Sequence, residues 1–200
     1  MLRRWSSIPG LILLALAFIT SCGVPVSVGG KQGSGNHAQE NPPFTVLVNR
    51  EKTGVDAQYD PQRAVGNLYH QITVYSADGR QTVLNAANQP VLFSAYWCPH
   101  CQRTLVLLNQ HASSIKTLPI IVSTGFAPGT SLQTAKRLTA EEEQGLHLSG
   151  MTVDYLLGTQ YQQYVPQGFP TLAYGSQGKV DLLIGEHTLQ VWQRALAMQP

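Results

Sequence analysis

Residues 91–102 read VLFSAYWCPHCQ, and the predicted fold depends most on this stretch. The apolar run 91–96 has the length and composition of a buried central strand. The residues from Pro99 onward are expected to form a helix, because proline is tolerated in the first helical turn. Cys98 is therefore placed where a strand ends and a helix begins, and Cys101 lies one helical turn further along.

This placement has consequences for the two sulfurs. A cysteine at a helix N-terminus lies among unpaired N–H groups and the positive end of the helix dipole, and both favour its thiolate form. Because the thiolate is the nucleophile in thiol–disulfide exchange, Cys98 is the candidate attacking group. Cys101 is expected to be more buried and to wait as a thiol. It would then resolve a mixed disulfide by closing a Cys98–Cys101 disulfide.

The two residues between the cysteines are expected to tune the pair. Pro99 stiffens the turn, and His100 can donate a hydrogen bond to the thiolate and can carry charge near neutral pH. A helix dipole contributes about 0.3–1 kcal/mol, and up to about 2 kcal/mol when partly buried. The most acidic cysteines in such motifs favour the thiolate by roughly 7 kcal/mol. Direct hydrogen bonds and the dipeptide must supply the difference, so His100 is predicted to decide how oxidising the pair is.

The rest of the chain is interpreted as one α/β domain around this motif. Asp78-Gly79 marks a hairpin turn, and Leu189, Trp192 and Leu196 lie on one side of an amphipathic closing helix. After residue 90 the order is βαβαβαββα, which implies a sheet with helices on both faces. Periodicity and turn signals predict strands at 44–48, 72–75, 81–84, 91–96, 118–123, 152–157, 171–174 and 180–184, and helices at 99–113, 130–148 (in one piece or two), 160–164 and 188–198.

The N-terminal residues predict export. Two arginines precede an apolar run at 11–19 that is too short to span a bilayer comfortably, a pattern typical of a secretory signal peptide. Residues 19–22 (ITSC) resemble a bacterial lipobox, which implies cleavage before Cys22 and a lipid on its sulfur. An ordinary signal peptide with an incidental Cys22 is the alternative. We expect a signal peptide at 1–21, a flexible Gly/Ser/Asn/Pro-rich tether at 22–43 and a folded domain at 44–200.

Charge and cysteine usage narrow the class of protein. Removing residues 1–21 takes away two arginines and no acidic residue, so the formal net charge falls from +2 to 0. A nucleic-acid partner is therefore not expected. With Cys22 assigned to lipid attachment, one pair of cysteines remains. A bond between positions i and i+3 closes a small loop and stabilises the fold little, so the pair is better explained by chemistry.

Residues 91–101 resemble the active-site strand and helix start of thioredoxin-like proteins, and the Cys-Pro-His-Cys version is that of DsbA-type disulfide oxidases. The string 95–102 is also similar to the thioredoxin-like domains associated with bacterial vitamin K epoxide reductase homologues. The sequence Gly168-Phe169-Pro170-Thr171 is a second family feature. The resemblance implies a cis Pro170 facing the cysteines and a Phe169 whose backbone binds an extended substrate. Trp97 is interpreted as a core residue, as a hydrophobic lip for the substrate, or as both.

The resemblance covers roughly residues 88–200, with two departures. Thioredoxins and DsbA-type proteins carry a buried carboxylate six residues before the first cysteine, which helps to move the proton of the second cysteine. Leu92 occupies that position here. The segment between the second cysteine and Pro170 is longer than in plain thioredoxin, so residues 124–150 are expected to be an insertion before the cis-proline strand. Residues 44–88 are expected to add an N-terminal β extension.

A metal site is the alternative use of a Cys-x-x-Cys pair. Zinc requires four ligands, yet the sequence has no second cysteine pair, and His111 stands alone. Copper chaperones of the thioredoxin-like fold generally place three residues between the cysteines, whereas this chain places two. We therefore expect neither a metal nor a cofactor.

The sequence thus predicts a lipid-anchored thiol–disulfide oxidoreductase on the extracytoplasmic side of the cell membrane. Its partners would be thiols and disulfides of exported proteins. The first hypothesis is an oxidase or isomerase recharged by a quinone-linked thiol oxidase of the membrane. The second is a reductase, for example in cytochrome c maturation, and the third is a metal-binding chaperone of the same fold.

Overall fold

A computed structural model describes residues 55–197. The predicted strand 44–48, the signal segment, the tether and the lipidation candidate Cys22 lie outside the described residues. Between residues 55 and 197, no helix has the length and apolar character needed to cross a membrane.

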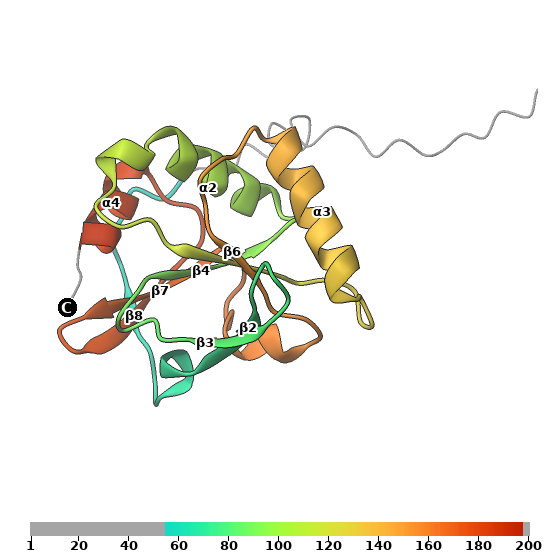
Figure 1. The fold of residues 1–200 in the computed structure, drawn as a ribbon. Coiled ribbons are helices and arrows are strands. Elements are labelled where there is room, and N and C mark those ends of the chain that lie inside the picture. The colour runs from blue at the N-terminus through green and yellow to red at the C-terminus, as the bar shows by residue number, and fades with distance from the viewer. Residues whose placement is uncertain (1–54, 198–200) are drawn as a thin grey trace, which may run out of the picture. The chain divides into compact units, whose positions relative to one another are not determined.

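An eight-stranded mixed sheet forms the centre of the domain, in the order β1-β8-β7-β4-β5-β6-β2-β3 (Figure 1). The predicted strands within the described residues are confirmed to within two residues at each end. The observed strands are β1 Gln62–Arg63, β2 Ile72–Tyr75, β3 Gln81–Leu84, β4 Val91–Ala95, β5 Ile120–Thr124, β6 Val153–Tyr155, β7 Thr171–Ser176 and β8 Lys179–Ile184. The two-residue β1 was not predicted.

The strand that leads into the cysteine motif lies in the middle of the sheet. β4 is parallel to β5 and antiparallel to β7, and all five of its residues are buried. Leu92 belongs to one apolar cluster and Phe93 to another, so successive side chains enter cores on opposite faces of the sheet. This double burial explains the continuous apolar run and holds the end of β4 in a fixed position.

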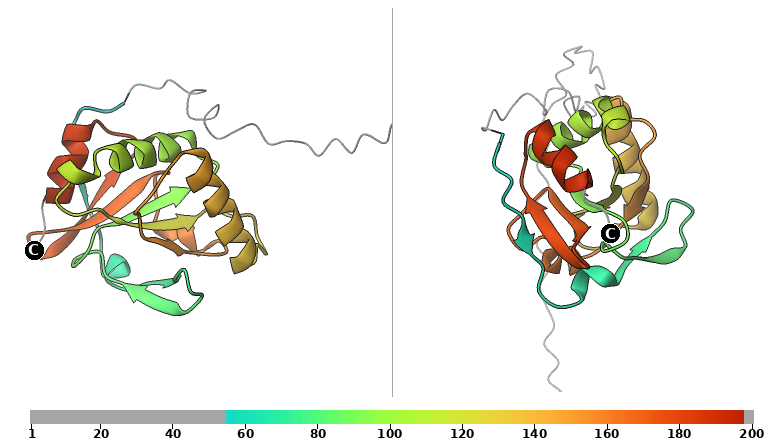
Figure 2. Two further views of the ribbon diagram at one scale, coloured as in Figure 1. Left: turned by 45° about the horizontal axis from the view of Figure 1, so that its top comes forward. Right: turned by 90° about the vertical axis from the view of Figure 1, so that its left-hand side faces the viewer.

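The three α-helices, α2 Pro99–Gln110, α3 Leu132–Gly145 and α4 Leu189–Ala197, pack on one face of the sheet (Figure 2). Leu105 and Leu108 of α2 meet Trp192 and Leu196 of α4 in one buried cluster with Leu92. The sequence predicted helices on both faces. The opposite face is covered instead by the short 3-10 helices η1 Leu68–His70 and η3 Gln160–Gln163, and a third, η2 Ala112–Ser114, follows α2.

Within the predicted range 130–148 the structure has a single, shorter helix, α3, rather than two pieces. Ser131 caps its N-terminus and accepts a hydrogen bond from the Thr134 N–H at 3.2 Å. Thr139, which could have begun a second piece, is buried in the helix interior and shares a 2.8 Å hydrogen bond with Ser123 of β5. The helix continues because this hydroxyl bonds to the core and does not cap a new helix.

The N-terminal part of the domain supplies both edges of the sheet. β1 pairs with β8, while the β2–β3 hairpin pairs with β6 at the opposite edge. Ahead of β1, the Asp56 N–H donates to Glu186 O at 3.0 Å, and the Thr188 N–H donates to Asp56 O at 2.9 Å. The start of the described chain is therefore bonded on two sides to the loop between β8 and α4.

Candidate active site

The two cysteines lie where the sequence placed them. Cys98 is the N-cap residue of α2, with Pro99 at the first helical positions, and its N–H donates to Ala95 O at 2.9 Å. Cys98 is 6% exposed and Cys101 is 0% exposed. The Ala95 N–H points at Cys101 Sγ, 3.4 Å away. The sulfurs are not bonded to each other, so this is the dithiol form of the pair, and its disulfide stays a prediction.

The surroundings of the two thiols shift their pKa values in opposite directions. The Cys101 thiol donates a hydrogen bond to the Cys98 sulfur, and this bond does most to lower the pKa of Cys98, against the opposing effect of burial. The backbone N–H groups of Cys101 and His100 lower that pKa further, and the charge of the His100 ring lowers it least. Burial raises the pKa of Cys101 well above its ordinary value. The His100 ring was expected to contribute most to lowering the pKa of Cys98. In the dithiol form the hydrogen bond from Cys101 contributes most instead.

His100 belongs to an outer charged cluster with Arg103 and Glu186. His100 Nδ1 lies 3.0 Å from Glu186 Oε2 and 2.9 Å from an Arg103 guanidinium nitrogen. Arg103 also donates to both carboxylate oxygens of Glu186, at 2.8 Å and 2.6 Å. A carboxylate only accepts and a guanidinium only donates, so Nδ1 can serve one of them at a time, depending on the histidine tautomer.

The Glu186 carboxylate of this cluster is largely buried, with 8% of its side chain exposed. Burial acts to raise the pKa of Glu186, but hydrogen bonds from Arg103 and His100 outweigh it and leave that pKa below its usual value. Glu186 therefore keeps its negative charge at neutral pH, and the cluster binds the first turn of α2 to the loop after β8.

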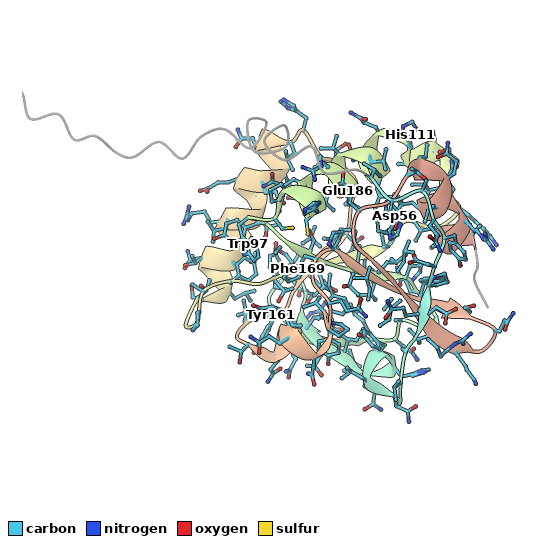
Figure 3. All side chains as sticks on the ribbon, turned by 180° about the vertical axis from the view of Figure 1, so that it is seen from behind. Asp56, Trp97, His111, Tyr161, Phe169 and Glu186 are labelled. Carbon is cyan, nitrogen blue, oxygen red and sulfur yellow. The ribbon has the colours of Figure 1, made fainter. Side chains whose placement is uncertain are left out.

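An aromatic row extends beside the cysteines (Figure 3). Trp97 is 50% exposed and meets the Phe169 ring edge-on, with the ring centroids 5.9 Å apart. Phe169 in turn stacks on Tyr161 at 5.7 Å. The Phe169–Pro170 peptide is cis, as predicted, and Phe169 packs against the buried cluster that holds both cysteines. The row offers an apolar surface beside the cysteine pair.

Gly125 fixes the position of Trp97. The indole Nε1 donates to Gly125 O at 2.9 Å. Gly125 has a φ of +72°, and a Cβ added there would lie 3.1 Å from Ala95 Cβ and 3.4 Å from the rings of Phe169 and Trp97. Only glycine combines this backbone conformation with so close an approach.

A carboxyl group lies on the buried side of the pair. Glu142 of α3 is 3% exposed, and its Oε1 has no hydrogen-bond partner within the described chain. Burial, together with the charges of Glu143 and Cys98, raises the pKa of Glu142 to about 8. This carboxyl group is therefore mostly uncharged at neutral pH, in contrast to Glu186.

Within residues 55–197, one cluster of side chains has the spacing to hold a metal ion. The ligand atoms of Asp56, Asp60 and His187 lie within 4.8 Å of one another. Neither cysteine belongs to this cluster, so the structure offers no described third ligand beside the sulfurs.

Four residues that contribute to the site were not predicted from the sequence. Arg103 could have been found, because it lies three residues after His100 on the same helix face. Glu186 and Glu142 carry no local signal, since each reaches the site from a distant part of the chain. Tyr161 was predicted only as part of a short helix.

No protein-family model and no curated protein matches this chain. Among solved structures, a secreted Mycobacterium tuberculosis disulfide oxidoreductase homologous to Escherichia coli DsbE is similar, with a TM-score of 0.49 and 16% identity, over 65% of this chain and 98% of that one. StoA from Bacillus subtilis has a TM-score of 0.45 and 15% identity, over 64% of this chain and 98% of that one. The exposed lipoprotein thioredoxin Etrx1 from Streptococcus pneumoniae has a TM-score of 0.41 and 16% identity, over 64% and 95%.

The arrangement of this chain settles its fold. A mixed central sheet, a cysteine pair at the start of a helix that follows the central strand, and a cis-proline beside that pair occur together here. The chain has a thioredoxin-like fold.

Proposed function

We propose that this chain is a protein thiol–disulfide oxidoreductase that acts on exported proteins outside the cytoplasm, held to the membrane by a lipid on Cys22. One observation carries the enzymatic part of this proposal. Cys98 lies at the N-terminus of α2, where hydrogen bonds lower the pKa of its thiol, while Cys101 lies directly behind it and is fully buried. That asymmetry is what an attacking sulfur and a resolving sulfur require.

The reaction is dithiol–disulfide exchange. When the protein acts as an oxidase, a substrate thiolate attacks Cys98 Sγ of the disulfide, and the electron pair of the broken S–S bond passes to Cys101. A second substrate thiolate then attacks the substrate sulfur of the mixed disulfide and expels Cys98 as a thiolate, so that the substrate is oxidised and the pair reduced. Pro99 and the backbone of His100 shape the environment of Cys98. Trp97, Phe169 and Pro170 form the surface against which the substrate lies.

We favour the oxidising direction. The thiolate of Cys98 stabilises the dithiol form, and a stable dithiol form means a more positive potential. The Glu142 carboxyl group is mostly uncharged at pH 7, so it opposes that thiolate little. A quinone-linked thiol oxidase of the membrane would restore the disulfide. A reductase remains the alternative, and the standard potential decides between them: a value near about −120 mV indicates an oxidase, and one near about −270 mV a reductase.

Trapping of mixed disulfides tests the exchange itself. Cys101→Ser is expected to accumulate mixed disulfides with exported proteins, because the second sulfur that would release them is gone. Cys98→Ser, the matched control, is expected to accumulate none. Equal trapping by both variants, or by neither, would contradict the roles given to the two sulfurs.

The anchor has a separate test. Cys22→Ser is expected to release the protein from the membrane fraction and to remove an acyl mass from the mature N-terminus. A Cys22→Ser protein that stays in the membrane as firmly as the wild type would show that the lipid assignment is wrong, without bearing on the exchange reaction.

A further inference from the structure

Two buried polar atoms face the same small cavity behind the cysteines. Ser94 Oγ and Glu142 Oε1 both lack a hydrogen-bond partner within the described chain, and both residues line a cavity of about 10 Å³ among β4, β5, β6, α2 and α3. That volume holds about one water molecule. Buried polar groups in folded proteins are almost always paired, often through an ordered water. The cavity is thus a built site for one water between a hydroxyl and a carboxyl group.

The cavity adjoins the buried sulfur. Ser94 directly precedes Ala95, whose N–H points at Cys101 Sγ, and the Ser94 hydroxyl lies close enough to lower the pKa of Cys101 without completing a full hydrogen bond. The Ser123 and Thr139 hydroxyls of the cavity wall are bonded to each other at 2.8 Å. Glu143 and five apolar side chains complete the wall. The polar path from Cys101 therefore leads through Ser94 toward α3.

Exchange at the cysteine pair requires a proton at Cys101. When the Cys98–Cys101 bond breaks, the electron pair goes to Cys101 Sγ, which is 0% exposed and cannot be solvated as a thiolate. It must gain a proton, and in the reverse direction the Cys101 thiol must lose one before it attacks Cys98. Bulk water does not reach this sulfur, so the proton has to come from a buried group.

We propose that Glu142 is the proton donor and acceptor for Cys101, acting through the Ser94 hydroxyl and one water in this cavity. This inference rests on the proposed exchange reaction. Glu142 does not touch the sulfurs and is a positioning residue for the proton. α3 thereby supplies the carboxyl group that β4 lacks, since Leu92 is fully buried among apolar side chains.

The charges around Glu142 favour transfer at the right step. Two charged groups act on it: Glu143 on its own helix and Cys98 at the start of α2, and both raise its pKa. The side chains that β4, β5 and β6 contribute to the cavity are uncharged, and Tyr155 of β6 faces Glu143. A mixed disulfide removes the Cys98 charge and so lowers the pKa of Glu142. More of the carboxyl group is then in the ionised form that can accept a proton when Cys101 must lose one.

The test isolates the step in which Cys101 acts. Reduced protein is mixed with oxidised glutathione, and the decay of the Cys98–glutathione mixed disulfide is followed by rapid quenching and mass analysis from pH 5 to 9. Glu142→Gln is expected to slow this decay on the order of 100-fold near pH 7 and to remove the carboxyl-dependent limb of the pH profile. The rate at which Cys98 is alkylated is expected to change less than about twofold in this variant, because alkylation of Cys98 requires no proton transfer to or from Cys101.

Two further variants keep the test decisive. Ser94→Ala breaks the other end of the relay and is expected to remove the same limb of the pH profile. Glu143→Gln, a control one residue away, is expected to keep this limb but to shift it toward lower pH, because one of the charges that raise the pKa of Glu142 is removed. An unchanged profile in Glu142→Gln, or an equal loss in Glu143→Gln, would overturn the assignment.

An infrared readout separates this inference from the proposed function. The difference spectrum between the dithiol and disulfide forms is expected to contain the carbonyl band of a protonated carboxylic acid, and Glu142→Gln is expected to lack it. The band does not depend on any protein substrate. If trapping with Cys101→Ser fails while this band is present, the proposed function is wrong and the proton site stands. If trapping succeeds and the band is missing in the wild type, the proton site is wrong.

Discussion

A carboxyl group lies on each side of the cysteine pair, and the pKa values of these two groups are shifted in opposite directions. On the outer side, Glu186 is held as a carboxylate by Arg103 and His100. On the inner side, Glu142 has no ion pair within the described chain, and its pKa is raised to about 8. The outer side, toward Cys98, carries a charged carboxylate. The inner side, toward Cys101, carries a carboxyl group that is mostly uncharged. The two carboxyl groups that flank the pair come from distant parts of the chain and therefore differ in charge at neutral pH.

A charge placed on the inner side gives the largest expected effect. Leu92→Asp buries a carboxylate among apolar side chains and is expected to destabilise the fold by about 4 kcal/mol at pH 7. Burial raises the folded pKa of such a carboxyl group, so the penalty relative to the uncharged control Leu92→Asn is absent below about pH 3.9 and grows as the pH rises toward the folded pKa. Urea unfolding at pH 4 and pH 8 measures this. Equal stability of Leu92→Asp and Leu92→Asn at both values would mean that the inner side tolerates charge.

Removing charge from the outer side gives the next largest effect. Glu186→Gln leaves Arg103 without its bidentate partner and is expected to cost about 2 kcal/mol at pH 7. Because the folded pKa of Glu186 is lowered, its stabilisation is present at neutral pH and is lost as the pH falls through that value.

Urea unfolding of the wild type and Glu186→Gln at pH 7 and pH 3 is the measurement, with Asp78→Asn of the exposed Asp78–Arg80 pair as control. The difference between the wild type and Glu186→Gln should narrow at pH 3. A difference that stays constant across this range would show that the carboxylate charge contributes nothing.

The close packing of Gly125 against Trp97 can be probed by substituting two glycines of similar backbone conformation. Gly125 and Gly129 have φ values of +72° and +80°, but only at Gly125 would an added Cβ meet neighbouring atoms. Gly129→Ala is expected to cost about 1 kcal/mol for the backbone alone, and Gly125→Ala about 2 kcal/mol. Thermal unfolding measures both, and tryptophan fluorescence should change only in Gly125→Ala. Equal losses would show that the close approach is not what excludes a side chain.

The smallest expected effect is that of the histidine in the motif. His100→Ala removes a ring whose Nδ1 faces Glu186 and Arg103 and whose charge lowers the Cys98 pKa least among the causes. The potential is expected to fall by about 15 mV, which corresponds to about 0.7 kcal/mol. Equilibration with glutathione measures the change. A fall of roughly 60 mV or more would restore His100 as the residue that sets the potential.

Features with a local signal were predictable, and features that depend on distant contacts were not. The β4–α2 junction follows from an apolar run and a proline, so both cysteines were placed correctly. The cis Phe169–Pro170 peptide followed from family resemblance. Arg103 and Glu186, by contrast, are 83 residues apart, and no periodicity connects them. Likewise, Thr139 and Glu142 have the spacing of a capping box, and only the packing of α3 against β5 shows that both are buried.

The bonds at Asp56 have a mechanical consequence. The described chain enters the domain through two backbone hydrogen bonds to Glu186 and Thr188, before it reaches any paired strand. A pull on the chain ahead of Val55 is therefore borne first by the loop that holds Glu186, and only afterwards by β1 and the sheet. The loop between β8 and α4 therefore receives a force on the N-terminal chain and also holds the Glu186 carboxylate beside His100.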